Sequence, residues 1–338
     1  MPKKANIYDV AKLAGVSHQT VSRVLNNHSS LKPATREKVE MAIAELSYRP
    51  NQAARQLVTS KSRMIGVLIA ESELFGPSSM LNAMQDVARK EGYSVISISV
   101  VTKSRDSWRE GIEQLRNLDV DGVITIALHK DIVKEIERYL LGITIVLIGS
   151  EPSQKFNVVN MDNLMGAILA TQHLIDLGHT EIVHVAGPEN AYEAQMRRAG
   201  YEQTMKSADL VPKVFAGTWS IESGYLAGKE IAGLKKLPTA IFTANDHSAI
   251  GLIKVLHEQG ISVPEQISIV GYDNIPESNF VIPSLTTIKP NFDALGNAAI
   301  EKMIMQLRQG NSKEAVMLKP ELVIRNSTVA AQSGKRKK

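Results

Sequence analysis

The chain has 338 residues, of which 43% are hydrophobic and 22% charged, and it contains no cysteine. Single hydrophobic cores stop growing at about 250 to 300 residues, so we expect more than one domain. The lack of cysteine excludes disulfides and thiolate chemistry, and the eight histidines lack metal-binding spacing, so we expect no metal and no cofactor. No apolar run approaches the roughly 18 residues of a membrane span. Polar Met1–Lys4 opens the chain instead of a secretory signal, which predicts a cytoplasmic protein.

Positive charge is concentrated at the N-terminus. Residues 1–60 carry nine Lys or Arg and four Asp or Glu, whereas residues 61–334 carry 26 and 31. A basic head on a slightly acidic body indicates that the head contacts a polyanion. The basic residues 335–338 could do the same, but a disordered tail over residues 331–338 is the preferred interpretation.

Three short helices are predicted within residues 1–50. Apolar side chains at helical spacing predict a first helix over residues 8–14, and Gly15 follows where this helix must end. Pro33 starts a third helix over residues 34–46, whose apolar face can cover the other two.

The second predicted helix, over residues 17–26, carries side chains suited to DNA. Ser17 can cap its N-terminus, and Val21 and Val24 lie on its apolar side. The opposite side is polar and presents His18, Gln19, Ser22 and Arg23. Such side chains can hydrogen bond to base edges and phosphates in a major groove. The pattern favours a helix-turn-helix domain.

From Met64 onward, short β-branched runs alternate with helical patterns. The runs cover residues 65–69, 95–98, 122–126, 143–148, 182–185, 240–242 and 267–272. This alternation predicts βαβ units in parallel sheets. Because it restarts after Asp162, we expect two α/β lobes with a cleft between them, where ligands bind at the carboxyl ends of strands.

Several exact motifs point to a family. They are Asp9–Ala11, Ala14–Ser17, Thr20–Asn26, Thr35–Val39 and Tyr48–Asn51. Together they resemble the head of the lac/gal repressor (LacI/GalR) family, and the resemblance spans residues 5 to about 330. It implies a two-lobed body similar to periplasmic sugar-binding proteins.

The expected organisation follows from this resemblance. The domains are a helix-turn-helix domain at residues 1–50, a hinge helix and linker at 51–61, a two-lobed effector-binding and dimerisation domain at 62–330, and the tail. The first lobe covers about residues 62–161 and 292–320, and the second covers about 162–291 and 321–330.

The resemblance implies a set of DNA contacts. His18, Gln19 and Arg23 would read bases, and the phosphate contacts would be Ser17, Thr20, Ser22, Asn26 and Asn51. The family pattern that matches best has tyrosine in place of His18, so operator preference can differ. The alternative for each residue is a solvated surface side chain.

A hinge helix is implied over residues 51–57. So short a helix is marginal in water, so we expect it to order only on DNA and against a partner hinge. Ala54 and Leu57 would then enter the minor groove, with Leu57 wedged at a central base step. The alternative is a linker whose Leu57 packs on the body.

The resemblance also implies an effector pocket. Its members would be Leu74, Phe75, Pro77, Met80, Arg197, Trp219, Asn245, Asp273 and Phe292. An aromatic ring can cover a sugar's apolar face while Asp, Asn and Arg bind its hydroxyls. The alternatives are a core indole at Trp219, a loop cap at Asp273 and a surface ion pair at Arg197.

Three positions depart from the family pattern. Gly149 stands where an aspartate is expected after the fourth strand, Thr102 or Lys103 replaces an arginine, and Pro290 replaces a glutamine. These changes leave the identity of the sugar open, with a galactoside-like ligand as the first candidate.

We therefore expect a transcriptional repressor that binds a pseudo-palindromic operator in double-stranded DNA as a homodimer and releases it on binding a small sugar. Residues 327–338 show no apolar heptad that would favour a tetramer. An enzyme is not expected, because the sequence lacks a dinucleotide fingerprint, a P-loop and a GxSxG motif. The alternatives are a transporter's solute-binding protein and a repressor controlled by a protein corepressor.

Overall fold

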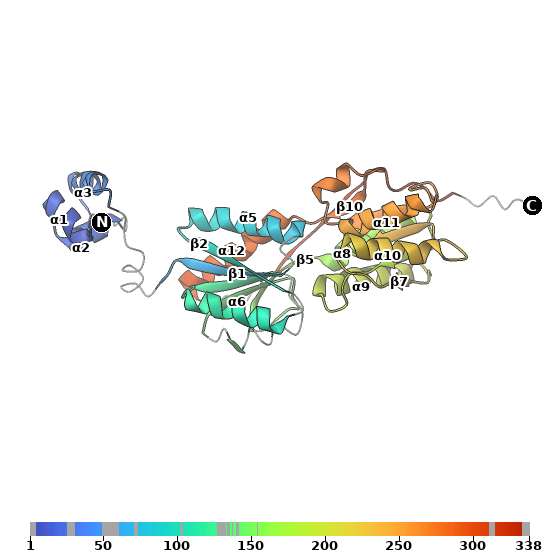
Figure 1. Cartoon of the computed structure of the whole chain (residues 1–338), viewed down its shortest axis with the longest axis horizontal. Coiled ribbons are helices and arrows are strands. Elements are labelled where there is room, and N and C mark those ends of the chain that lie inside the picture. Colours follow the sequence, from blue (N-terminus) through green and yellow to red (C-terminus); the bar gives the residue numbers. More distant parts are fainter. Residues whose placement is uncertain are drawn as a thin grey trace, which may run out of the picture. The chain divides into compact units, whose positions relative to one another are not determined.

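The computed structural model describes residues 5–25, 31–48, 61–70, 74–101, 104–126, 142–153, 155–310 and 315–332, together with Val133, Ile136, Arg138 and Tyr139. The chain divides into two compact units, Met1–Ser62 and Arg63–Lys338 (Figure 1).

The N-terminal unit packs three helices around a small apolar core. They are α1 (Ile7–Ala14), α2 (His18–Leu25) and α3 (Pro33–Glu45). Asn6 caps α1, since its Oδ1 accepts from the Tyr8 amide at 2.8 Å, and Gly15 ends this helix with a left-handed φ of 65°. Each helix contributes a fully buried valine to the core: Val10, Val21 and Val39.

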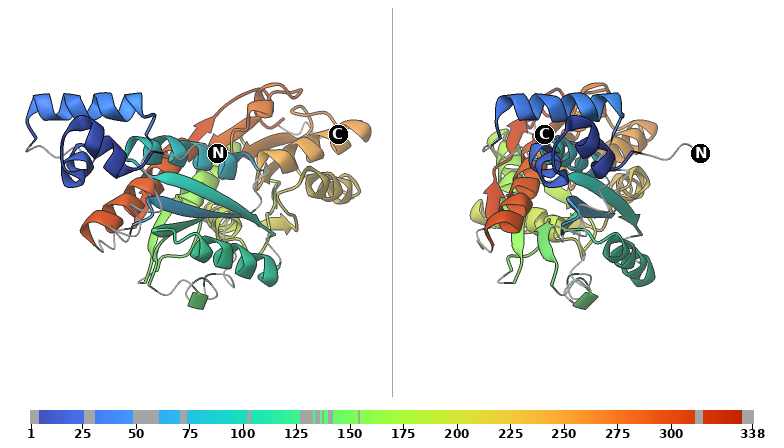
Figure 2. Two further views of the ribbon diagram at one scale, coloured as in Figure 1. Left: turned by 60° about the vertical axis from the view of Figure 1, so that its left-hand side comes forward. Right: turned by 90° about the vertical axis from the view of Figure 1, so that its left-hand side faces the viewer.

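The first sheet of the C-terminal unit has the order β11-β5-β4-β3-β1-β2, and its strands pair in parallel. Its strands are β1 (Met64–Ala70), β2 (Ser94–Val100), β3 (Gly122–Ile126), β4 (Thr144–Ile148), β5 (Asn157–Met161) and β11 (Val316–Leu318). Helices α5 (Phe75–Lys90) and α12 (Phe292–Gln309) cover one face, and α6 (Arg105–Asn117) covers the other (Figures 1 and 2). A separate hydrophobic cluster fills each interface.

The second sheet has the order β12-β10-β9-β8-β6-β7, in which only β12 runs antiparallel to its neighbour among the described strands. Its strands are β6 (Ile182–Val185), β7 (Lys213–Phe215), β8 (Ala240–Thr243), β9 (Ser268–Tyr272), β10 (Thr286–Lys289) and β12 (Glu321–Val323). The helices are α8 (Asn163–Asp176), α9 (Tyr192–Ser207), α10 (Ile221–Ala232), α11 (Asp246–Glu258) and the 3-10 helix η1 (Pro276–Asn279). Helices α8 and α9 pack in one cluster, and α10 and α11 pack in another.

The chain connects the two lobes in three places within its described part: between β5 and α8, between β10 and α12, and between β11 and β12. The predicted fold class, a helix-turn-helix head with a two-lobed α/β core, is confirmed. Among the described helices, none has both the length and the apolar character needed to cross a membrane.

Candidate functional site

A cavity with about 840 Å³ of open space lies between the two lobes. In both lobes, its walls come from the carboxyl ends of strands and the N-termini of helices. Ligands of open α/β sheets bind at this edge. The lining residues are Leu74, Gly76, Pro77, Met80, Ile126, Ile148, Gly149, Met161, Asn163, Ala191, Glu193, Arg197, Trp219, Asn245, Asp273, Pro290, Phe292 and Leu295.

The first lobe supplies a mostly apolar wall from α5 and α12. The two helices approach closely at Gly76, where an added Cβ would lie 2.7 Å from the ring of Phe292. Phe75, predicted as an effector contact, does not line the cavity; its ring packs edge-on against Phe292 with centroids 6.0 Å apart. Phe75 therefore acts on the cavity by holding Phe292.

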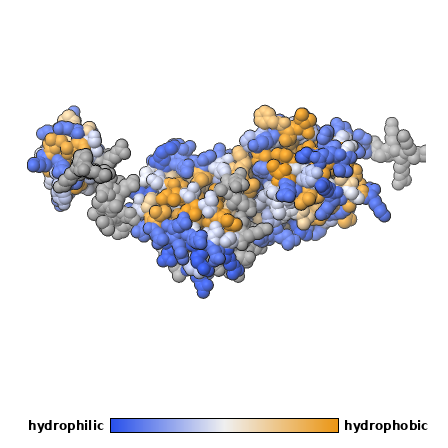
Figure 3. All heavy atoms as spheres, in the orientation of Figure 1, coloured by the Kyte–Doolittle hydropathy of each residue, from blue (hydrophilic) through white to orange (hydrophobic). Residues whose placement is uncertain are grey.

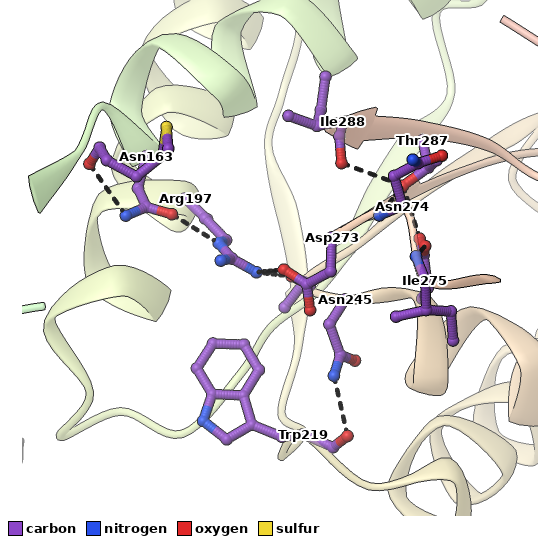
Figure 4. Close-up of polar contacts among 12 residues, drawn as sticks. Asn163, Arg197, Trp219, Asn245, Asp273, Asn274, Ile275, Thr287 and Ile288 are labelled. Carbon is purple, nitrogen blue, oxygen red and sulfur yellow. Dashed lines mark hydrogen bonds and ion pairs between the residues drawn. The ribbon is translucent and has the colours of Figure 1, made fainter. Parts of the chain in front are cut away.

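The second lobe supplies a buried arginine. The Arg197 Nε donates to Asn163 Oδ1 at 2.9 Å, and its Nη1 lies 3.4 Å from Asp273 Oδ1 (Figure 4). Its guanidinium also lies 3.6 Å from the Tyr272 ring centroid and 5.3 Å from that of Trp219. These partners offset the cost of burying the charge and hold the guanidinium plane in one orientation.

Asp273 is held in an unusual backbone conformation. Its φ is 104°, in a region that side-chain-bearing residues rarely adopt, and its amide donates to the Ile288 carbonyl at 2.8 Å. Burial raises the pKa of the Asp273 carboxyl, and the Arg197 charge opposes this shift. Strained residues gather at binding sites, and this strain orients a carboxylate into the cavity.

Trp219 and Asn245 are joined in the same wall. The indole lies against Gly187, where an added Cβ would be 2.7 Å from the ring. Asn245 Nδ2 donates to the Trp219 carbonyl at 2.9 Å, and its Oδ1 caps α11 by accepting from the Ser248 amide at 3.0 Å. One amide hydrogen and one lone pair of Asn245 remain for a ligand.

The structure brings together Leu74, Pro77, Met80, Arg197, Trp219, Asn245, Asp273 and Phe292 around the one cavity. The neighbouring Arg198 is exposed and pairs with Glu202 at 2.7 Å. Sequence reasoning missed Asn163 and Glu193. Asn163 begins α8 two positions after β5 ends, so its place near a strand end was a usable signal, whereas Glu193 on α9 gave none.

Asn160, in β5, was also missed by the sequence analysis, and it supports the backbone beside the cavity. Asn160 Oδ1 accepts from the amides of Gly149 and Ser150 at 3.1 and 3.3 Å, and its Nδ2 donates to the Ser150 carbonyl at 2.8 Å. Asn160 thereby fixes the backbone that follows β4. The result is a mostly apolar cavity with aromatic faces and a small set of fixed polar groups, suited to holding a small hydroxylated molecule.

The predicted DNA-contacting residues lie on or beside α2. His18, Gln19 and Arg23 are exposed, and Ser17 Oγ caps the helix by accepting from the Thr20 amide at 3.2 Å. Ser22 is half-buried on the same helix. Asn26, Asn51, Ala54 and Leu57 lie outside the described residues, as do Thr102 and Lys103.

The ring of His18 rests 5.1 Å from that of Tyr8 in α1, at an interplanar angle of 42°. This contact restricts the direction of one predicted base-reading side chain. In the described part of the chain, no group of three or more His, Asp or Glu side chains is arranged to hold a metal ion.

Two family models match the chain. The model for bacterial regulatory proteins of the lacI family matches residues 6–51, and the periplasmic binding protein-like domain matches residues 171–328. The Lactose operon repressor of Escherichia coli strain K12 is 33% identical, covering 97% of this chain and 92% of the relative. The repressor PurR of Vibrio campbellii is 33% identical (96% and 98%), and the Ribose operon repressor of E. coli strain K12 is 32% identical (96% and 99%).

Solved structures agree with these matches. A lac repressor dimer bound to operator and the anti-inducer ONPF has a TM-score of 0.88 at 33% identity, covering 97% of this chain and 100% of that one. The regulator CelR in complex with cellobiose has a TM-score of 0.74 at 26% identity, covering 96% and 99%. The chain is therefore a DNA-binding transcriptional repressor with a ligand-binding core, and it belongs to the lacI family of bacterial regulatory proteins.

Proposed function

We propose that this repressor binds a pseudo-palindromic operator as a homodimer and releases it when a small polyhydroxylated ligand, with a galactoside as first candidate, occupies the cavity. It would act in the cytoplasm, where operator DNA lies, as a regulator and not as an enzyme. Relatives named as repressors of the lactose and ribose operons support a sugar ligand.

The observation that carries the proposal is the composition of the cavity. Trp219 and Phe292 offer apolar faces, while Arg197, Asp273 and Asn245 offer donors and acceptors within the same space. A sugar has the matching pattern, with hydroxyls around its edge and C–H groups on its faces.

The DNA interface is assigned to α2. The exposed His18, Gln19 and Arg23 would read bases, and Ser17, Thr20 and Ser22 would contact phosphates with Asn26 and Asn51. Residues 51–61 would form the hinge, with Ala54 and Leu57 in the minor groove. The solute-binding alternative leaves this basic head without a role.

Homodimerisation is assigned to an apolar surface of the second lobe. Phe280 and Ile282, which follow η1, are 83% and 90% exposed, so two large apolar side chains close together in the chain face solvent in the lone protomer. Figure 3 displays apolar side chains gathered over this lobe near β10 and α11. A second copy of the chain would cover Phe280 and Ile282. Dimerisation itself is supported by the similar lac repressor structures, which are described as dimers.

Ligand binding and operator binding would be coupled because the cavity is built from both lobes. A ligand that favours one arrangement of the lobes changes the spacing of the hinges in a dimer, and so the affinity for two half-sites. Occupation of the cavity would then weaken operator binding.

The test is a fluorescence-anisotropy titration of a symmetric lactose-type operator at fixed salt, with random DNA as control. Each titration is repeated with a panel of galactosides and glucosides. Specific binding that one sugar releases supports the proposal. Specific binding that no sugar changes would contradict sugar control and favour a protein corepressor, and equal binding to both DNAs would contradict operator recognition.

A further inference from the structure

The loop that follows β9 presents Asp273 to the cavity and contains two consecutive residues in rare backbone conformations. Asp273 and Asn274 have φ of 104° and 52°. Positive φ is uncommon for residues with a side chain and persists only where the surroundings impose it. The groups that hold this loop therefore determine where the Asp273 carboxylate lies.

The carboxylate of Asp246, in the first turn of α11, binds this loop. Its Oδ2 accepts from the Ile275 amide at 3.0 Å, and its Oδ1 accepts from the Thr287 hydroxyl at 2.6 Å. Thr287 lies in β10, and its Oγ1 accepts from the Asn274 amide at 3.4 Å (Figure 4). Asp246 thus joins the loop after β9 to the neighbouring strand β10.

Asp246 is fully buried and is not among the residues that line the cavity. Its carboxylate packs closely on β9, since a Cβ added to Gly271 would lie 2.1 Å from Asp246 Oδ1. Burial raises the pKa of the Asp246 carboxyl well above its ordinary value, and the charge of Asp273 raises it further. Burying such a group is costly unless its hydrogen bonds are satisfied, and both of its oxygens are bonded to the loop and β10. Asp246 therefore acts through the backbone that it holds.

Arg325 anchors the same loop independently. Its Nη2 donates to Asn274 Oδ1 at 2.7 Å, and its Nη1 donates to the Leu285 carbonyl at 2.7 Å. Because the loop keeps this anchor when Asp246 is replaced, we expect variants at Asp246 to fold and to change the loop locally.

We infer that Asp246 is a positioning residue for ligand binding. Through its bonds to Ile275 and Thr287 it holds the Asp273 carboxylate toward the cavity, without touching the ligand itself. The inference rests on the proposed binding of a sugar in this cavity, and it adds a residue that no contact with the sugar would reveal.

A double-mutant cycle on the full-length protein separates positioning from a general effect on folding. Dissociation constants for methyl β-galactoside and methyl β-glucoside are measured by calorimetry for the wild type, Asp246→Ala, Asp273→Ala and the double variant. Asp246→Ala should weaken binding at least about tenfold when Asp273 is present, and less than about twofold when Asp273 is replaced. Equal losses in the two backgrounds would overturn the positioning role.

A conservative variant and a matched control accompany the cycle. Asp246→Asn should bind within about threefold of the wild type, because its amide oxygen accepts from Ile275 while its amide nitrogen donates to Thr287 Oγ1. Thr171→Ala removes a buried hydroxyl that donates to the Ala167 carbonyl at 2.8 Å within α8. This control should lower the free energy of unfolding and leave both sugar affinities unchanged. An Asp246→Asn variant as weak as Asp246→Ala would overturn the role of the two hydrogen bonds.

Hydrogen exchange gives a readout that needs no sugar. Amide exchange over residues 273–275, measured by mass spectrometry, should become faster in Asp246→Ala and stay at the wild-type rate in Asp246→Asn and Thr171→Ala. Unchanged exchange in Asp246→Ala would overturn the inference. Faster exchange in that variant, together with a wild-type protein that binds neither glycoside, would instead overturn the proposed sugar control and support Asp246 as the residue that holds the loop.

Discussion

Arg197 and Asp273 form a buried ion pair at 3.4 Å across the second-lobe wall of the cavity. The arginine is also held by Asn163 and lies over the Tyr272 ring, so its position is determined by several partners at once. The carboxylate sits on a strained backbone. A ligand thus meets donors and acceptors that are already in place, which reduces the entropy lost on binding.

Replacing Arg197 with lysine should weaken ligand binding by at least about tenfold, because lysine cannot reproduce the planar fork or the stacking on Tyr272. The control is Arg198→Lys, at the adjacent exposed residue that pairs with Glu202. Calorimetry of both variants with the sugar that releases the operator provides the comparison. Equal affinity in the two variants would remove Arg197 from the binding site.

Replacing Arg23 with alanine should cost about 1–3 kcal/mol in operator binding and less on random DNA, because a base contact adds to the nonspecific phosphate attraction. Arg198→Ala removes the same charge from the body and should leave operator binding unchanged. Anisotropy titrations at one salt concentration measure the affinity of both variants for operator and for random DNA. Equal losses on operator and random DNA would show that Arg23 does not read bases.

Replacing Ile282 with aspartate should convert the dimer to monomers, because it places a charge in a surface that dimerisation would desolvate. Val211→Asp is the control, since Val211 is 86% exposed and lies before β7, away from η1. Sedimentation of both variants measures their oligomeric state. An Ile282→Asp variant that remains dimeric would place the interface elsewhere, and a wild-type tetramer would contradict the dimer itself.

His184 should make the second lobe sensitive to acid. Its side chain is fully buried, its Nδ1 lies 2.9 Å from the Phe242 carbonyl oxygen, and burial lowers its pKa to about 3. The unfolded chain binds a proton near the ordinary pKa of about 6.5. The free energy of unfolding should therefore fall as the pH drops from about 6.5 towards about 3, with about 2 kcal/mol lost between pH 7 and pH 5.

Urea unfolding at pH 7 and pH 5 measures this loss. His184→Phe should reduce the pH dependence by that amount, because phenylalanine can stack on Phe242 without titrating. His257→Gln, at an exposed position, is the control. A His184→Phe variant with the wild-type pH dependence would exclude the buried histidine as its source.

Several strands were predictable because runs of β-branched residues in the sequence coincide with strands in the structure. The run at residues 65–69 lies inside β1, and the run at 122–126 is β3 itself. Strand β5 was missed because Asn157 and Asn160 interrupt its apolar pattern, although both are buried. Strands β7 and β12 have only three residues, too few for a pattern to emerge.

The cavity was predictable where residues follow strands directly. Asn245 and Asp273 come just after the runs at 240–242 and 267–272, and Trp219 was assigned through the family resemblance. Glu193 was not predictable as a lining residue, because its carboxylate comes to lie beside Gly149, a residue of the other lobe more than forty positions earlier. Its place in the cavity wall is created by tertiary contact and leaves no local signal.

The most direct test of the central claim is reciprocity between the two sites. The affinity for the releasing sugar is measured by calorimetry with free protein and with protein saturated by operator, and operator affinity is measured with and without that sugar. Linkage requires that both affinities fall by the same factor. Equal sugar affinity with and without operator would contradict the proposed coupling.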